Sequence, residues 1–245
     1  MGDRTGRFVW RELMTNDVDA SSRFYGELFG WKIDPAPTHE GATSHRLILA
    51  DGKQIGDIMP MIGVPAHWTS YVGVHDVDAA ASRATEAGGN VVVAPTDIPG
   101  VGRFAVLGDG QGAKITAFRG HGTAQPMERP GLWEFCWEQL NAANAERATD
   151  FYARVFDWKA ETSDTGLGVF NVGTTQVATL LQAPPGVTSH WITYVVVPKL
   201  GEARDRAKRL GGKVYVEEMP VPGMGRISIL GDNVGAVLGI FEADL

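Results

Sequence analysis

Two residues of the stretch FVWRELM (8–14), Trp10 and Glu12, could take part in ligand binding or acid–base chemistry. The stretch is rich in apolar and aromatic residues, as is typical of a β-strand, and side chains two positions apart on a strand share one face. Glu12 is therefore expected beside Trp10, and the later pair Trp137 and Gln139 repeats this spacing. A carboxylate on an inward strand face is costly unless it is paired or hydrated, so Glu12 is a candidate general base or ligand-binding group.

Glu12 and the tryptophans could each have a structural role instead of a role in ligand binding. Glu12 could form an ion pair at the rim of a site with one of three arginines, Arg11, Arg46 or Arg103. Four tryptophans could stack on a planar ligand or could fill the core, namely Trp10, Trp68, Trp137 and Trp191. These alternatives stay open at the level of the sequence.

Composition excludes several other kinds of chemistry. Cys136 is the only cysteine, so neither an internal disulfide nor a cysteine-based metal cluster can form. A formal charge of −7 argues against bulk nucleic-acid binding, which depends on dense Lys and Arg. No apolar stretch approaches the ~20 residues of a membrane helix, and the amino terminus has no signal-peptide pattern. A cytoplasmic protein without nucleic-acid or membrane partners is expected.

An internal repeat determines the expected organisation of the chain. HWTSYVGVHD (67–76) recurs as HWITYVVVPK (190–199), and nearly all of 8–118 is repeated as 135–241. Two tandem domains are predicted at 1–120 and 132–245, with a Gly- and Pro-rich linker at 121–131. The repeated histidines, His67 and His190, are interpreted as capping or interface residues, because a metal site needs a converging set of ligands.

Each copy divides again into two halves of β-α-β-β-β order. In the first half of the first copy we expect a strand, a helix and three strands, at Phe8–Met14, Val18–Phe29, near Lys32, His45–Ala50 and Gln54–Met61. In the second half we expect a strand at Trp68–Val74, a helix between Asp76 and Gly88, and strands near Val91–Val93, Phe104–Leu107 and Lys114–Phe118. The fold class is therefore α+β.

The pattern L-x-x-x-D-x-x-x-S-x-x-F-Y-x-x-x-F-G-W, met as Leu13 to Trp31, resembles the vicinal oxygen chelate superfamily, and GDGQGAKI (108–115) resembles its last turn and strand. That superfamily includes glyoxalase I, extradiol dioxygenases and bleomycin-binding proteins. The resemblance covers almost the whole chain, in both copies. It implies that paired βαβββ units form a curved mixed sheet whose concave face holds the ligand.

The resemblance also implies where a divalent metal would be held in each copy. The implied positions carry Trp10, Ser70 and Thr116 in the first copy and Trp137, Thr193 and Gly239 in the second. A further position falls near Gly56 to Ile58, where Asp57 is the only acid, or near Thr179 to Leu181 in the second copy. Tryptophan cannot ligate a metal, and neutral hydroxyls are poor ligands, so no metal and no other cofactor is expected. A novel site that combines Glu12, Asp57 and one histidine stays open.

Three functions are compatible with these features. The first is a metal-free protein that binds and sequesters a small aromatic or cationic molecule, as a monomer or homodimer. The second is a glyoxalase-, dioxygenase- or hydroxylase-type enzyme with a non-standard site and Glu12 as the candidate catalytic residue. The third is a structural or interaction module. The residues expected to bind a ligand are Trp10, Glu12, Asp57, Ser70, Thr116, Trp137, Gln139 and Thr193.

Overall fold

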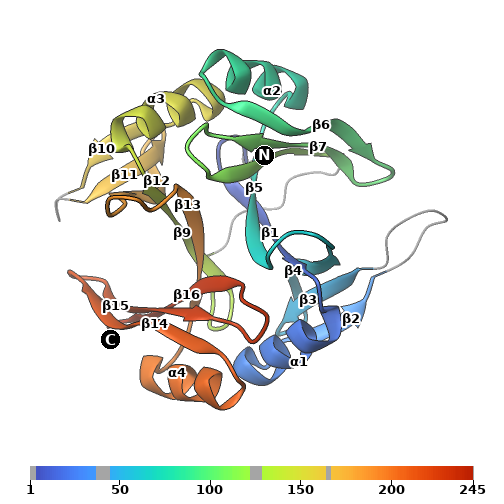
Figure 1. Ribbon diagram of the computed structural model, residues 1–245, viewed down its shortest axis with the longest axis vertical. Coiled ribbons are helices and arrows are strands. Elements are labelled where there is room, and N and C mark those ends of the chain that lie inside the picture. The colour runs from blue at the N-terminus through green and yellow to red at the C-terminus, as the bar shows by residue number, and fades with distance from the viewer. Residues whose placement is uncertain (1–3, 37–44, 122–128, 164–166, 245) are drawn as a thin grey trace. The chain divides into compact units, whose positions relative to one another are not determined.

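The computed structural model describes residues 4–36, 45–121, 129–163 and 167–244, in which four helices and sixteen strands are found (Figure 1). The elements of the first copy are β1 (Phe8–Thr15), α1 (Val18–Phe29), β2 (Lys32–Pro35), β3 (Arg46–Ala50), β4 (Lys53–Pro60), β5 (His67–Gly73), α2 (Val77–Glu86), β6 (Asn90–Ile98), β7 (Gly102–Gly108) and β8 (Lys114–Gly120). Those of the second copy are β9 (Phe135–Ala142), α3 (Ala145–Phe156), β10 (Lys159–Thr162), β11 (Gly168–Val172), β12 (Thr175–Gln182), β13 (His190–Val196), α4 (Leu200–Arg209), β14 (Lys213–Val221), β15 (Gly225–Gly231) and β16 (Val237–Ala243).

Each sequence copy forms one mixed sheet of eight strands. The strand orders are β2-β3-β4-β1-β5-β8-β7-β6 and β10-β11-β12-β9-β13-β16-β15-β14, so the two sheets have the same topology. In the first sheet β1 pairs with β4 and β5 with β8 in parallel, whereas β2, β3 and β4 form an antiparallel run. The predicted α+β fold of four βαβββ units is confirmed.

The helices begin and end where the sequence predicts. The Asp17 carboxylate accepts the backbone N–H of Ala20 at 2.9 Å and so caps the start of α1. Gly30 ends this helix with a left-handed φ of 73°, a conformation that glycine adopts without strain. Asn144 caps α3 in the same way, at 2.9 Å from the N–H of Arg147. Among the described residues, none of the helices has the length and apolar character needed to cross a membrane.

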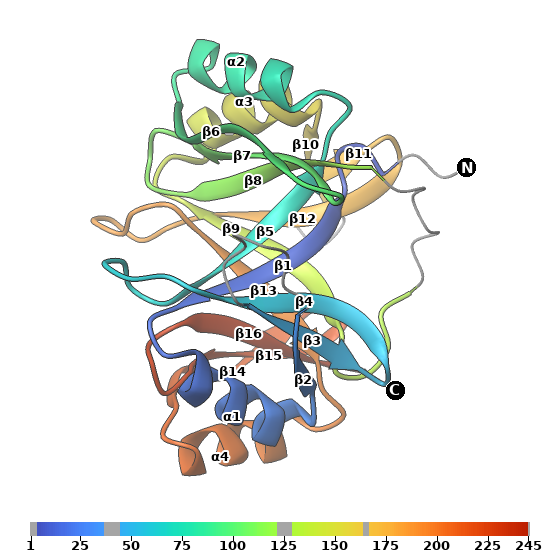
Figure 2. The same cartoon turned by 90° about the vertical axis from the view of Figure 1, so that its right-hand side faces the viewer.

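The chain folds into two compact units that combine parts of both copies. Unit 1 comprises Met1–Trp10, Thr69–Glu128 and Glu138–Trp191, and unit 2 comprises Arg11–Trp68, Arg129–Trp137 and Ile192–Leu245. In unit 1, α2 packs beside α3, and in unit 2, α1 packs beside α4 (Figure 2). The tandem domains at 1–120 and 132–245 therefore stay a prediction about the repeat. Most of the proposed linker at 121–131 lies outside the described residues.

The core of unit 2 contains a hydrogen-bonded chain of aromatic and acidic side chains. Tyr25 of α1 is fully buried and lies edge-on to Trp68, with ring centroids 5.3 Å apart. The indole N–H of Trp68 donates to the Tyr25 hydroxyl at 3.0 Å, and that hydroxyl donates to Oδ2 of Asp232 at 3.0 Å. Oδ1 of Asp232 accepts backbone N–H groups of its own turn. Tyr25 thus ties a helix of the first copy to a turn of the second.

Unit 1 contains a similar cluster, in which no hydrogen bond from the tyrosine to the aspartate is found among the described residues. The indole N–H of Trp191 donates to the Tyr152 hydroxyl at 2.9 Å, as the repeat predicts. Asp109, the counterpart of Asp232, accepts the N–H groups of Gln111 and Ala113 through Oδ1. Its buried Oδ2 has no hydrogen-bond partner within the described part of the chain. Burial raises the pKa of both aspartates and of both tyrosines above their ordinary values.

Replacing the two tyrosines by phenylalanine should therefore have unequal effects on stability. Tyr25→Phe leaves both the Trp68 N–H and Asp232 Oδ2 buried without the hydroxyl between them, so the free energy of unfolding should fall by about 2–3 kcal/mol. Tyr152→Phe affects the Trp191 N–H alone and should cost about 1 kcal/mol. Urea denaturation of the two variants measures the difference, and equal losses would contradict it.

The raised pKa of Asp109 predicts how stability depends on pH. The folded chain keeps the Asp109 proton at pH values where the unfolded chain, with an ordinary value of 3.8, has lost it. The contribution of this group to stability is therefore present at low pH and decreases as the pH rises above that value. Asp109→Asn should flatten this decrease in urea titrations at several pH values. Asp232→Asn, at the other aspartate whose pKa is raised by burial, should also flatten the decrease and should in addition lower stability at neutral pH, because an amide nitrogen or a turned side chain disrupts the bond to Tyr25. An unchanged pH slope in Asp109→Asn would contradict the assignment.

Candidate functional site

Two carboxylates lie side by side in unit 2. Parallel pairing of β1 with β4 places Glu12 directly opposite Asp57. Antiparallel pairing of β3 and β2 extends this row through Leu47 to Asp34. Residues paired across strands point to the same face of a sheet, so Asp34, Leu47, Asp57 and Glu12 form one row, here called the acidic face.

The acidic face is turned away from the helix of its own half. On the other side of the same strands, Leu13, Ile48 and Ile58 are completely buried in the core that contains α1. Successive residues on a strand alternate between faces, so Glu12 and Asp57 lie on the face opposite α1. Their exposures are nevertheless only 4% and 7%. The structure therefore holds two adjacent acidic groups in a largely dry environment.

Basic side chains lie beside two acids of the acidic face. Neighbouring strands are about 4.8 Å apart, so two ionised carboxylates in register repel each other unless cationic or donor groups offset them. His45 Nε2 lies 4.0 Å from Asp57 Oδ2, and Lys32 Nζ lies 2.5 Å from Asp34 Oδ2.

Two of the arginines considered as partners of Glu12 bind other residues. Arg46 donates to Asp19 and to the Ser22 hydroxyl, and Arg103 pairs with Asp78 and Asp97.

The second copy carries the corresponding row in unit 1, with neutral residues at its two central positions. The registers align Glu161, Val169, Thr179 and Gln139, so Thr179 is the counterpart of Asp57. The sequence comparison left this position open between Thr179 and Leu181, and the strand pairing identifies it. Gln139 donates to Asn141 Oδ1 at 3.0 Å. The two central carboxylates of the first copy are thus an alcohol and an amide in the second.

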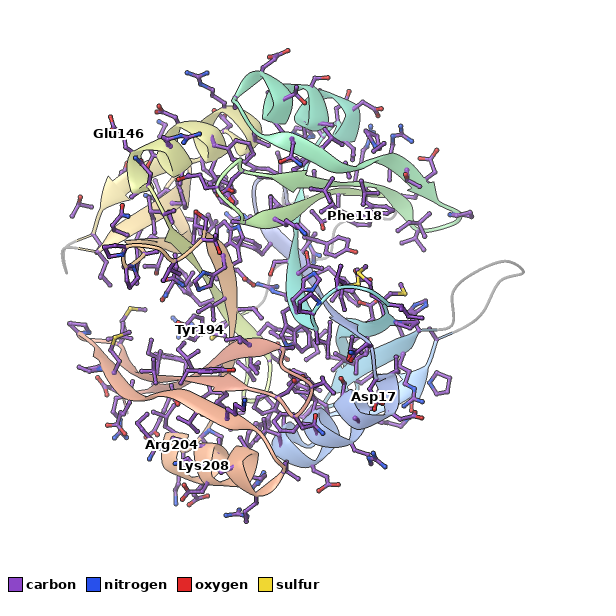
Figure 3. The ribbon with its side chains drawn as sticks, in the orientation of Figure 1. Asp17, Phe118, Glu146, Tyr194, Arg204 and Lys208 are labelled. Carbon is purple, nitrogen blue, oxygen red and sulfur yellow. The ribbon has the colours of Figure 1, made fainter. Side chains whose placement is uncertain are left out.

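A second face of interest lies on the β5–β8 half of unit 1. Tyr71 pairs with Thr116, and Thr116 pairs with Val106. One row further, Phe118 pairs with Phe104, and the Tyr71 and Phe118 rings meet edge to face at 5.9 Å. We call Tyr71, Phe104, Val106, Thr116 and Phe118 the aromatic face. Figure 3 labels Phe118 on β8.

The corresponding face of the second copy, in unit 2, is filled by its own side chains. Ile192, Tyr194, Ile227 and Ile229 form a buried apolar cluster, and Trp137 packs against it. Gly239 occupies the position of Thr116, and a Cβ atom there would overlap the ring of Tyr194. Tyr194 is labelled in Figure 3. The place of the last implied metal ligand is thus taken by an aromatic ring.

Ser70 and Thr193 do not lie with the other candidate residues. Since Tyr71 pairs with Thr116, its neighbour Ser70 points to the opposite face, where its hydroxyl donates to Oε2 of Glu138 at 2.9 Å. Thr193 is likewise next to Tyr194, which pairs with Gly239. These two assignments are corrected, because an alignment shifted by one residue moves a strand side chain to the other face.

Glu138 was missed by the sequence analysis. It stands where the first copy has Arg11, and it is 1% exposed on a strand. An acid within an apolar strand pattern was the available signal.

The remaining aromatic and histidine residues have structural contacts. Trp68 and Trp191 belong to the buried hydrogen-bonded clusters, which supports core filling for this pair. His67 and His190 each approach the carbonyl oxygen two residues earlier, at 2.8 and 3.0 Å, as capping histidines do. Trp10 is half-buried on the face of β1 that also carries Glu12.

The implied metal positions do not fit a divalent ion. An indole N–H donates a hydrogen bond and offers no lone pair, which removes Trp10 and Trp137 from the ligand set. Ser70 points away from Thr116, and Gly239 has no side chain. Within the described ranges, no three His, Cys, Asp or Glu side chains are arranged to hold a metal ion, including Glu12, Asp57 and His45.

A shallow depression of about 360 Å³ lies at the start of α1 and is a weaker candidate site. It is lined by Asn16, Asp17, Val18, Asp19, Arg46 and Pro60. Its charged groups are already engaged, because Asp17 caps the helix and Asp19 pairs with Arg46. Its walls therefore offer little charge for a ligand.

The sequence of this chain is similar to a known protein family and to several known proteins. Residues 7–117 match the family described as the Glyoxalase/Bleomycin resistance protein/Dioxygenase superfamily. "Anthracycline biosynthesis protein DnrV" of Streptomyces peucetius is 31% identical, over 97% of this chain and 93% of its own length. "Putative glyoxylase CFP32" of Mycobacterium tuberculosis is 29% identical, over 98% of this chain and 95% of its own length.

Solved structures share the fold at lower sequence identity. A Mn(II)-bound glyoxalase from Novosphingobium aromaticivorans has a TM-score of 0.63 and 15% identity, over 98% of this chain and 82% of its own. The 2,3-dioxygenase LapB from Pseudomonas sp. KL28 has a TM-score of 0.65 and 10% identity, over 99% of this chain and 94% of its own.

Measuring the bound metal tests directly whether the implied metal positions can hold a divalent ion. Protein incubated with Mn²⁺, Ni²⁺, Fe²⁺ or Zn²⁺ and then desalted should retain far less than one equivalent, because the implied positions lack ligands. Inductively coupled plasma mass spectrometry gives the ratio. Retention near one equivalent that is lost in Glu12→Ala or Asp57→Ala would contradict this expectation and would establish a novel site.

Proposed function

Because the chain belongs to the glyoxalase/bleomycin resistance protein/dioxygenase superfamily, we propose that it binds a small organic cation with a planar ring at the acidic face of its first copy. No metal takes part in this binding. The observation that carries the proposal is the buried pair of Glu12 and Asp57, opposite each other on parallel strands.

The charge of this pair supports recognition of a cation. Attraction between opposite charges is stronger in a poorly hydrated site than in water, because the local dielectric constant is lower. An ammonium group beside Glu12 and Asp57 would add a charge-assisted hydrogen bond to the contacts that these carboxylates already make. The neutral counterparts, Gln139 and Thr179, provide no such attraction. A cationic ligand should therefore prefer the first copy.

Two further observations support the expectation that the ligand contains a planar ring. Trp10 lies two residues before Glu12 on β1, so both side chains occupy one face of the strand. The name of the relative DnrV connects it with anthracycline biosynthesis, and anthracyclines contain a planar aromatic ring system. A ligand that carries a flat ring as well as an ammonium group fits both observations.

A glyoxalase-type enzyme is the second candidate. The name of the mycobacterial relative CFP32 contains "glyoxylase", and a buried carboxylate such as Glu12 could abstract a proton from a bound substrate. The metal that would polarise the substrate in such a reaction has no fitting ligand set among the residues that the structure describes. Binding without turnover is therefore the better supported function.

Glu12→Gln should weaken the binding of a cationic ring compound by about 1–3 kcal/mol, the usual range for losing a charge-assisted hydrogen bond. Calorimetric titration with an anthracycline that carries an amino sugar measures this loss. The uncharged aglycone of the same compound should bind wild type and Glu12→Gln almost equally.

Gln139→Ala is the matched control in the second copy and should leave both affinities nearly unchanged. Equal affinity of wild type and Glu12→Gln for the amino compound would show that Glu12 is a structural ion-pair partner. Turnover of a glyoxalase substrate that is abolished in Glu12→Gln would favour the enzyme instead.

A further inference from the structure

We infer that the outer edge of β6, in unit 1, is a docking surface for a second copy of this chain, whose own β6 pairs with it in the antiparallel direction. β6 is the last strand of the first sheet, and it carries neither Glu12 nor Asp57. The inference is therefore independent of the proposed cation binding.

One edge of β6 has no neighbouring strand in the described part of the chain. β6 ends its sheet and pairs with β7 on one side, in the antiparallel direction (Figure 1). Backbone N–H and C=O groups along the outer edge of a sheet can form hydrogen bonds with a further strand. Such an edge is a template for another chain unless its sequence protects it.

The residues at the start of β6 are apolar, β-branched and exposed. Val91, Val92 and Val93 are 36%, 43% and 38% exposed and follow one another directly. Asp97 is the only charged residue of the strand, and its carboxylate lies 3.0 Å from the guanidinium of Arg103. An uncharged run of valines on an exposed edge is typical of strands that pair with another chain.

The equivalent edge strand of the second copy, β14 in unit 2, is protected by charged residues. It carries Lys213 and Glu217, and Glu217 forms an ion pair with Lys208 at 3.0 Å. A further strand on β14 would have to displace water from these charges, which opposes pairing. The repeat places Asn90 and Ala94 at the positions of Lys213 and Glu217. The first copy therefore lacks a protection that the second copy has.

The local structure of β6 limits the length of the contact. Its register with β7 shifts between Val91 and Val93 and again between Val93 and Thr96. β14 has the same shifts at the equivalent positions, so they belong to the shared framework. Pro95 has no N–H group to donate, so we expect pairing over residues 90–94. Such a short contact buries less than the ~1,200 Å² of a stable interface, and the dimer should be weak.

A second copy of the chain suits this edge because its own strand is equally uncharged. A charged strand would lose hydration beside the valines without gaining an ion pair. Asp97 determines the direction. In a parallel pair the two Asp97 carboxylates would lie side by side, whereas antiparallel pairing about Val92 separates them by about 30 Å, at ~3.3 Å per residue. Antiparallel pairing of identical strands also gives a closed two-fold dimer.

Sedimentation velocity over a range of protein concentrations tests the dimer. Wild type should change from monomer to dimer with a dissociation constant of about 1–100 µM, as expected for a small interface. Val92→Lys should raise this constant by about 10-fold or more, because two ammonium groups would meet near the symmetry axis. Tyr215→Lys is the equivalent change on β14 and should leave the constant unchanged. Both side chains are exposed, and circular dichroism checks that both variants stay folded.

Disulfide formation between molecules tests the direction of pairing. Cys136→Ser removes the only cysteine, so a cysteine introduced into that background can form a disulfide only with a second molecule. Val92→Cys should give a disulfide-linked dimer on mild oxidation, because equivalent residues beside a two-fold axis come within bridging distance. Asp97→Cys is the matched control and should stay unlinked, since antiparallel pairing keeps its two copies far apart.

Three outcomes would overturn the inference. The first is a wild type that stays monomeric at millimolar concentration, which would mean that this edge does not bind a second copy. The second is a dimer that Val92→Lys does not weaken. The third is a disulfide in Asp97→Cys without one in Val92→Cys. None of these outcomes affects the cation binding assigned to Glu12, which is measured by titration of a ligand.

Discussion

The register between parallel strands determines which side chains of this protein can act together. Pairing of β1 with β4 sets Glu12 opposite Asp57, and pairing of β5 with β8 sets Tyr71 opposite Thr116. A shift of one residue in either pair would send one partner into the apolar core beneath the helices. The buried rows that contain Leu13 and Ile58 on one side prevent such a shift, because those residues would then leave the apolar core and polar side chains would enter it. Packing on the sheet face that the helices cover therefore determines which side chains lie together on the opposite face.

The two copies keep the same framework and differ in the polar groups placed on it. The Trp–Tyr hydrogen bond is present in both units, at 3.0 Å for Trp68 and 2.9 Å for Trp191. Only one of the two tyrosines donates onward to an aspartate at hydrogen-bond distance. The copies also differ where Glu12 and Asp57 correspond to Gln139 and Thr179, and where Thr116 corresponds to Gly239. The two copies thus differ in the polar contacts that they make on one framework.

Much of the fold could be predicted from sequence because its signals are local. Asp17 and Gly30 mark the ends of α1 through capping geometry, and the spacing of Phe24, Tyr25 and Leu28 marks its buried side. The face of Glu12 also followed from strand alternation. Ser70 was misplaced because one residue of alignment uncertainty is enough to reverse a face. The sequence identified Thr116 as a candidate residue. It could not show that the Thr116 hydroxyl has no hydrogen-bond partner among the described residues, because this depends on side chains of two neighbouring strands.

The composition of the compact units could not be predicted, because it depends on contacts between distant segments. Tyr25 bonds to Asp232, and Trp31 donates its indole N–H to the carbonyl of Trp133 at 2.7 Å. These partners are more than a hundred positions away and carry no periodic signal of their own. Unit 1 has an equivalent bond, from Trp158 to the carbonyl of Gly6 at 2.7 Å. A repeat in the sequence shows that the chain has two similar copies. It does not show which half of one copy packs with which half of the other.

This sharing of halves has a consequence for how such a chain can evolve. A polypeptide with a single copy could build these units only by borrowing the missing half from a second identical molecule. Every substitution would then be present twice, so an acid gained at one face would be gained at both. Joining the copies in one polypeptide removes that restriction. Each face can then acquire its own chemistry while the pairs Tyr25–Asp232 and Trp158–Gly6 continue to hold the borrowed halves in place.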